Sequence, residues 1–148
     1  MKPWRFRSYL LPGRDARDAI EVWLLTLPDE AQAHIVGQIQ YSARLPIEWW
    51  EERHEYKRLT GELANLEALR FVVPEKVRRG QPAKEDHYRI LGFSDLSKLE
   101  FTMLCGFQKL TGNWDYEEYG LIANDRRQEV LENRKKYSHF SNWLIDDE

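Results

Sequence analysis

The chain has 148 residues, of which 42% are hydrophobic and 13% aromatic, and its formal net charge is −3. This length and composition predict one globular domain over residues 1–148 and exclude a disordered chain. The acidic balance argues against a dedicated nucleic-acid-binding domain, because such domains are usually basic. No apolar run reaches the length of a membrane span, and one cysteine excludes an intrachain disulfide. We therefore expect a cytoplasmic protein without membrane association.

The histidines and the basic residues are distributed very differently along the chain. The four histidines show no paired ligand spacing, so we predict no metal site and no cofactor. Basic residues instead concentrate between positions 76 and 89. They are Lys76, Arg78, Arg79, Lys84 and Arg89. Such a run is either a solvated loop or a surface that binds anions.

The first half of the chain predicts a strand followed by two helices. In "WRFRSYLL" apolar residues alternate with Arg5 and Arg7, which is typical of a half-buried strand. Apolar residues then recur at helical spacing over residues 14–27 and again from Asp29 to near Pro46. The stretch "EWWEERHEYKRLTGE" follows, and two adjacent tryptophans cannot both face one core. We expect a loop or a frayed helix there.

The second half predicts three strands and a helix. The strands are expected over residues 66–73, 87–93 and 100–107, with a long loop over 74–86. Asp115 and Glu118 form a capping-box pattern that opens the helix, and Gly120 is expected to loosen its first turn. The predicted order is β-α-α-β-β-β-α, an α+β fold with a small, mainly antiparallel sheet.

Two arginines within the predicted strands need partners. If the second and third strands form a hairpin, Arg70 and Arg89 approach the same patch, with Lys109 at its rim. Guanidinium groups match phosphate oxygens well, so we expect an anion site with both arginines facing solvent in a groove. The alternative is that each arginine pairs with a nearby acid. The candidate acids are Glu67, Glu85, Asp86 and Glu100.

Several motifs together resemble the HigB-type branch of the RelE/ParE toxin superfamily. They are "YKRLTGELANLEALRF", "HYRILGF", "FTMLCGFQKLTG" and "ANDRR". The matching residues are Lys57, Leu59, Gly61, Leu66, Leu69, Arg70, Tyr88, Arg89, Ile90, Gly106, Phe107, Lys109, Ala123 and Arg126. The resemblance covers roughly residues 4–136, and it implies a RelE-like fold with an N-terminal helical hairpin and a C-terminal helix.

The resemblance also implies a function, the toxin of a type II toxin–antitoxin system. Its partners would be an antitoxin, expected to be a helix-turn-helix protein, and mRNA on the ribosome. The toxin would be a metal-independent endoribonuclease in which a ribose 2′-OH attacks the adjacent phosphate. The implied catalytic residues are Arg70, Arg89 and Lys109 for charge, and His87 or Tyr119 for proton transfer. The implied RNA-binding residues are Lys57, Lys76, Arg78, Arg79, Lys84 and Arg126.

The sequence also departs from this pattern and leaves other functions open. Gln108 stands where the family commonly has a lysine, and the pI is about 5.9. A gyrase-poisoning toxin of the ParE type and a non-catalytic RelE-fold protein-binding module are the alternatives. Residues 137–148 extend beyond the usual family length. This aromatic extension either packs on the core or presents a partner surface.

Overall fold

The computed structural model describes residues 2–75, 79–82, 84–110 and 114–144. The strands are β1 (Arg5–Leu11), β2 (Arg17–Asp18), β3 (Tyr56–Arg58), β4 (Glu67–Glu75), β5 (Lys84–Asp95), β6 (Glu100–Gln108) and β7 (Ser138–Phe140). The α-helices are α1 (Ala19–Leu24), α2 (Asp29–Ser42), α3 (Ile47–Glu52), α4 (Trp114–Glu132) and α5 (Arg134–Tyr137), and two short 3₁₀ helices are η1 (Gly61–Leu63) and η2 (Asn142–Leu144).

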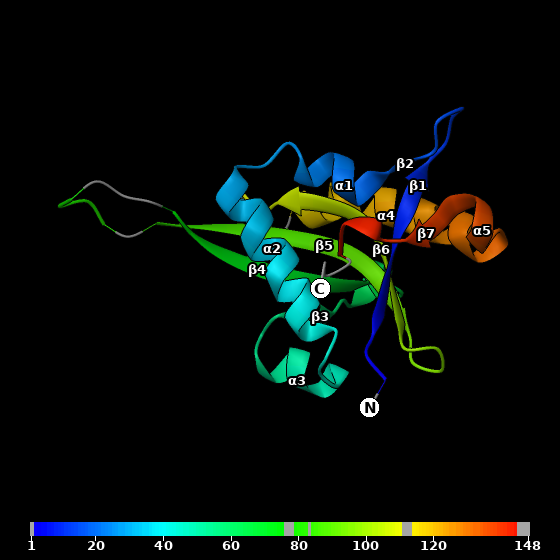
Figure 1. Cartoon of the computed structure of the whole chain (residues 1–148), viewed down its shortest axis with the longest axis horizontal. Coiled ribbons are helices and arrows are strands. Elements are labelled where there is room, and N and C mark those ends of the chain that lie inside the picture. The colour runs from blue at the N-terminus through cyan, green and yellow to red at the C-terminus, as the bar shows by residue number, and fades with distance from the viewer. Residues whose placement is uncertain (1, 76–78, 83, 111–113, 145–148) are drawn as a thin grey trace.

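The strands form one open sheet of seven strands in the order β2-β1-β6-β5-β4-β3, with β7 also paired to β1 (Figure 1). All pairs are antiparallel except β1–β6, which is parallel. The predicted α+β class and the mainly antiparallel sheet are confirmed. The predicted strand count is wrong, because β2, β3 and β7 are each only two or three residues long and carry no periodic signal of their own.

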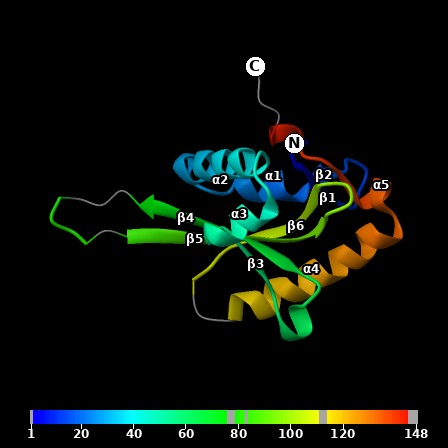
Figure 2. The same ribbon diagram turned by 90° about the horizontal axis from the view of Figure 1, so that it is seen from below.

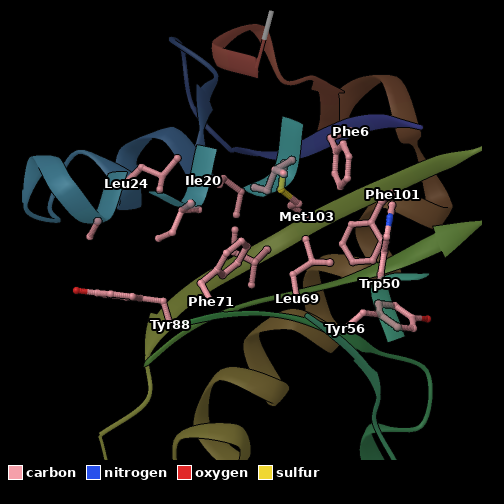
Figure 3. Close-up of a cluster of buried hydrophobic side chains, with 14 of the residues drawn as sticks. Phe6, Ile20, Leu24, Trp50, Tyr56, Leu69, Phe71, Tyr88, Phe101 and Met103 are labelled. Carbon is pink, nitrogen blue, oxygen red and sulfur yellow. The ribbon is translucent and has the colours of Figure 1, made fainter. Parts of the chain in front are cut away.

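Helices cover both faces of the sheet (Figure 2). On one face, α1, α2 and α3 bury a core that includes Ile20, Trp50 and Phe71, and Figure 3 shows these and neighbouring side chains meeting over the sheet. On the other face, a second core is built around Leu91 and Ala123, the latter on α4. Coverage of both faces explains why β6 is apolar on both sides.

The first helix is shorter than its apolar periodicity predicts. Residues 14–18 are not helical, and Arg17 and Asp18 pair instead with the end of β1. The Asp18 carboxylate accepts hydrogen bonds from the backbone N–H groups of Ile20 and Glu21, both at 2.9 Å. This side chain caps α1 and fixes its start at Ala19.

The stretch with adjacent tryptophans is ordered rather than a loop. Residues 47–52 form α3, in which Trp50 is 1% exposed and Trp49 is 54% exposed. The two rings therefore do not share one core, as the sequence requires. The Trp50 indole N–H donates to the carbonyl of Ser42, 2.7 Å away, and so ties α3 to the end of α2.

The C-terminal extension packs onto the body of the protein. β7 pairs with β1, and Trp143 and Leu144 lie against the first core. The Asp18 carboxylate accepts a hydrogen bond from the Trp143 indole at 3.0 Å, and the His139 ring lies 2.7 Å from the same oxygen. Residues 138–144 thus complete one edge of the sheet; residues 145–148 of the extension lie outside the described ranges.

The fourth helix runs through Gly120 without an interruption, contrary to the expected loose first turn. A Cβ at Gly120 would lie 2.6 Å from Cδ2 of Leu63, so glycine allows η1 and α4 to approach closely. No helix within the described ranges is long and apolar enough to cross a membrane.

Candidate anion-binding site

Arg70 and Arg89 are direct cross-strand partners in the antiparallel pair of β4 and β5. Residues directly opposite each other project their side chains on the same face of the sheet. That face is the one covered by α4, because Leu91, two residues from Arg89, belongs to the second core. The register of the hairpin therefore brings the two guanidinium groups to one patch.

The neighbouring strands add two lysines to this patch. Phe107 on β6 is paired with Arg89, and the N–H of Lys109 donates to the carbonyl of His87 at 2.7 Å, which continues the pairing past the end of β6. On the other side, Lys57 on β3 is paired with Ala68, two residues before Arg70. Cations on β3, β4 and β5 and directly after β6 thus face the start of α4.

These side chains surround a pocket of about 410 Å³, which we call the β4–β5 pocket. Its lining residues are Lys57, Leu59, Thr60, Leu63, Arg70, Arg89, Lys109, Tyr116 and Glu117. The lining thus holds four cationic side chains and one carboxylate. In a protein whose net charge is −3, this is a local excess of positive charge of the kind that attracts anions.

Arg89 is held rigidly at the base of the pocket. It is only 2% exposed, which corrects the expectation that both arginines face solvent. Its Nε donates to the Tyr116 hydroxyl at 3.0 Å and its Nη1 donates to the Tyr88 carbonyl at 2.9 Å. Nη2 keeps no acceptor among the described residues. A buried guanidinium with one fixed, unused end is well prepared to receive an oxyanion.

The acids proposed as alternative partners are engaged elsewhere. Glu67 accepts hydrogen bonds from the Ser94 hydroxyl at 2.6 Å and from the Tyr56 hydroxyl. The buried Glu100 pairs with Arg5 and Arg134 near the start of β6.

The same holds for the acids at the start of β5. Asp86 accepts a hydrogen bond from the side chain of Gln108 at 3.3 Å, and Glu85 lies 3.8 Å from the His87 ring. No carboxylate within the described ranges forms an ion pair with Arg70, Arg89 or Lys109. The arginines are thus available for an external anion.

Gln108, which stands where the toxin family commonly has a lysine, does not line the β4–β5 pocket. Gln108 is paired with Tyr88, whose side chain belongs to the first core, on the sheet face opposite to the pocket. Because side chains alternate along a strand, a lysine at position 108 would also point away from Arg89.

The two residues expected to move protons lie beside the pocket rather than in its lining. The His87 side chain is on the same face as Arg89 but two pairs further along the hairpin, and it is 42% exposed. The ring of Tyr119 stacks on Phe107, with centroids 4.6 Å apart, and belongs to the second core. Neither lines the β4–β5 pocket.

The expected RNA-binding residues do not form one surface. Lys57 lines the pocket. Arg79 and Lys84 are exposed toward the far end of the β4–β5 hairpin, which extends beyond the body of the protein (Figure 1). Arg126 donates to the Leu104 carbonyl at 2.8 Å and packs its guanidinium on Tyr9. The two remaining candidates, Lys76 and Arg78, lie outside the described residues.

Tyr116 is the site residue that sequence reasoning missed. Its hydroxyl contacts Arg89, its ring packs edge-on against Phe107, and Lys109 Nζ lies 5.7 Å from its ring centroid. The spacing of Tyr116 and Tyr119, one helical turn apart, is a signal that both face the sheet. Tyr116 is the nearer of the two to Lys109 along the chain.

Within the described ranges, no group of three or more His, Cys, Asp or Glu side chains is arranged to hold a metal ion. The chain matches no protein-family model, no curated protein and no solved structure.

Proposed function

We propose that this protein is a toxin of the HigB-type branch of the RelE/ParE superfamily and that its β4–β5 pocket cleaves mRNA on the ribosome. One observation carries the proposal, namely the convergence of Arg70, Arg89, Lys109 and Lys57 on one pocket. All four cations that line the pocket belong to the residues that the toxin motifs single out. The helical α1–α2 segment, the antiparallel β4–β5–β6 unit and the following α4 are the parts of the fold consistent with a RelE-like topology.

The chemistry requires no metal in this scheme. The ribose 2′-oxygen loses its proton and attacks the adjacent phosphorus, the bond to the 5′-oxygen breaks, and that oxygen gains a proton. The products are a 2′,3′-cyclic phosphate and a free 5′-hydroxyl. Negative charge accumulates on the non-bridging oxygens in between, and fixed cations stabilise that charge most strongly in a pocket shielded from water. Arg70, Arg89 and Lys109 have this role.

Proton transfer falls to the two α4 residues in the lining. The Tyr116 oxygen accepts a hydrogen bond from Arg89 Nε, so its own O–H is directed away from Arg89 and serves as a donor to the leaving 5′-oxygen. Glu117, the one carboxylate of the lining, accepts the 2′-proton. A base and an acid of this kind each contribute about 10²–10⁴-fold to rate. His87 remains a proton donor only if the RNA extends along the hairpin.

A toxin of this class needs an inhibitor, and α4 offers apolar surface for one. Leu121 and Leu131 are 68% and 54% exposed, and Leu110, just past β6, is 72% exposed. Leu110 directly follows Lys109 and Leu121 lies one helical turn beyond Glu117, whereas Leu131 lies near the other end of α4. Such apolar side chains along a helix that borders a cationic pocket fit a partner that contributes apolar contacts and acidic groups. We propose that the antitoxin covers this surface and neutralises the pocket, through an interface of about 1,200–2,000 Å² or larger.

The proposal is tested by controlled expression in bacteria with mapping of mRNA 5′ ends. The expected result is growth arrest together with new cut sites inside translated reading frames, which disappear when translation is blocked. Co-expression of a small neighbouring gene should restore growth. Normal growth at high expression contradicts the toxin assignment. Growth arrest with intact mRNA and inhibited DNA supercoiling would instead identify a gyrase poison.

A further inference from the structure

A second cationic cavity lies at the opposite end of α4 from the β4–β5 pocket. It has a volume of about 800 Å³ and is formed by the start of β1, the β5–β6 turn and the junction of α4 and α5, so we call it the β1–α5 pocket. Two carboxylates, Glu100 and Glu132, line it together with six cationic side chains. The cations are Lys2, Arg5, Arg7, Lys98, Arg134 and Lys135. The lining therefore carries a net charge of +4 in a chain of net charge −3.

Arg7 is the buried member of this group. It is 8% exposed, its Nε donates to the Ser138 hydroxyl at 3.0 Å, and its Nη2 donates to the Ser138 carbonyl at 3.2 Å. No carboxylate of the described residues pairs with it. A buried guanidinium without a counter-ion is costly, which calls for an explanation beyond packing.

The pairing of β1 with β7 sets two guanidinium groups side by side. Arg7 is the cross-strand partner of Phe140, and the guanidinium carbons of Arg5 and Arg7 each lie 4.5 Å from the centroid of that ring. The aromatic face stabilises both cations, and Nη1 of Arg5 and Nη1 of Arg7 have no acceptor among the described residues. Two guanidinium groups that pack on the same ring therefore hold hydrogen-bond donors in fixed positions.

The acids of the pocket do not balance these charges. Glu100, which is 4% exposed, accepts hydrogen bonds from Arg5 at 3.3 Å and from Arg134. The Glu100 carboxylate thus pairs with the guanidinium groups of Arg5 and Arg134, and the Arg7 guanidinium has no carboxylate partner among the described residues. Burial lowers the pKa of the Arg7 guanidinium, and the positive charges of Arg134 and Arg5 lower it further.

We propose that the β1–α5 pocket binds a phosphate group, with Arg7 as the buried anchor and Arg5, Lys98 and Arg134 as the surrounding donors. Phosphate fits because its tetrahedral oxygens accept hydrogen bonds from several forks at once. The phosphate comes either from a free phosphorylated small molecule or from the backbone of single-stranded RNA. Phosphate binding in the β1–α5 pocket does not depend on the proposed cleavage activity, because no residue that lines this pocket also lines the β4–β5 pocket.

The test is an NMR titration of the full-length protein, in which amide signals separate the two pockets. The two probes are inorganic phosphate and a 2′-O-methylated RNA octamer that cannot be cleaved by 2′-OH attack. Either probe should shift the amides of Arg7, Glu100 and Phe140 in a saturable way. Saturation with phosphate identifies a site for free phosphate compounds, and saturation with RNA alone identifies a backbone site.

Matched double variants decide whether the pocket itself binds. Arg5→Gln with Lys98→Gln removes two exposed cations from the pocket, and Arg14→Gln with Arg79→Gln removes the same charge elsewhere. The first variant should bind at least about tenfold more weakly while it still unfolds in one cooperative transition, and the second should bind as the wild type does. Arg70→Ala should also leave these shifts intact even if it abolishes cleavage. Equal weakening by both double variants, or no saturable shift at Arg7 with either probe, would overturn the proposal.

Discussion

Arg70 and Arg89 occupy opposite positions of one antiparallel strand pair, and no carboxylate of the described residues pairs with either. Like charges in direct cross-strand register destabilise a sheet unless something else compensates them. Arg89 is partly compensated by the Tyr116 hydroxyl and the Tyr88 carbonyl. The remaining positive potential points into the β4–β5 pocket, where a phosphate is the natural counter-charge.

Tyr116 and Tyr119 provide a matched pair of phenylalanine variants. Tyr116→Phe removes the acceptor of Arg89 Nε and the proposed proton donor, so the cleavage rate should fall by about a hundredfold or more. The free energy of unfolding should fall by about 1 kcal/mol. Tyr119→Phe retains the ring that stacks on Phe107 and should cleave at the wild-type rate.

The readout for this pair is single-turnover cleavage in a translating extract, with chemical denaturation as the stability control. If Tyr119→Phe loses activity and Tyr116→Phe does not, the proton donor is Tyr119, as the family resemblance implies.

Gly106 is required by the packing of Trp23 over β6. A Cβ at position 106 would lie 2.2 Å from the Trp23 ring, whereas a Cβ at Gly37 on α2 would meet nothing within 4 Å. Gly106→Ala should therefore destabilise the protein by about 1–3 kcal/mol. Gly37→Ala should stabilise it by about 0.5–1 kcal/mol, because alanine favours helix.

Thermal melting of both glycine variants checks this prediction. A melting temperature for Gly106→Ala at or above that of the wild type would show that Trp23 does not restrict this position.

Cys105 should be chemically inert in the folded protein. It is 5% exposed, and burial raises the pKa of its thiol to about 12. At pH 8 roughly one thiol in ten thousand is then ionised, and the thiolate is the reactive form. Alkylation by iodoacetamide should be negligible in buffer and complete in denaturant, as measured by intact mass. Rapid alkylation of the native protein would show that β6 is accessible from the α4 side.

The long strands could be predicted from sequence because each spans enough residues to show a pattern. β4 and β6 coincide closely with the expected ranges, whereas β5 begins three residues earlier and ends two residues later than expected, which shortens the predicted 74–86 loop. The lengths of α1 and of the short strands could not be predicted, since the Asp18 cap and the pairing of β7 with β1 are tertiary contacts. Apolar periodicity shows which side of a segment is buried. It does not show where a helix is capped or which short segment pairs with a strand.

The candidate site was predictable only in part for a similar reason. The hairpin connection implied that Arg70 and Arg89 lie near each other, but their direct register depends on how the two strands pair. Which tyrosine enters the pocket depends on the rotation of α4 about its axis. That rotation is set by contacts such as Gly120 with Leu63, which no local pattern encodes.

The most direct test of the proposed activity is the rate of translation-dependent mRNA cleavage by Arg70→Ala. Arg70 is preferable to Arg89 because it is half-buried and makes no side-chain ion pair with a described carboxylate, so the fold should tolerate its loss. Loss of one charge-stabilising donor should cost about 3–4 kcal/mol of transition-state stabilisation, roughly a hundredfold or more in rate. Arg79→Ala, at the exposed end of the hairpin, is the control and should cleave normally. Equal cleavage by the wild type and Arg70→Ala, at equal melting temperatures, would contradict a catalytic role for the β4–β5 pocket.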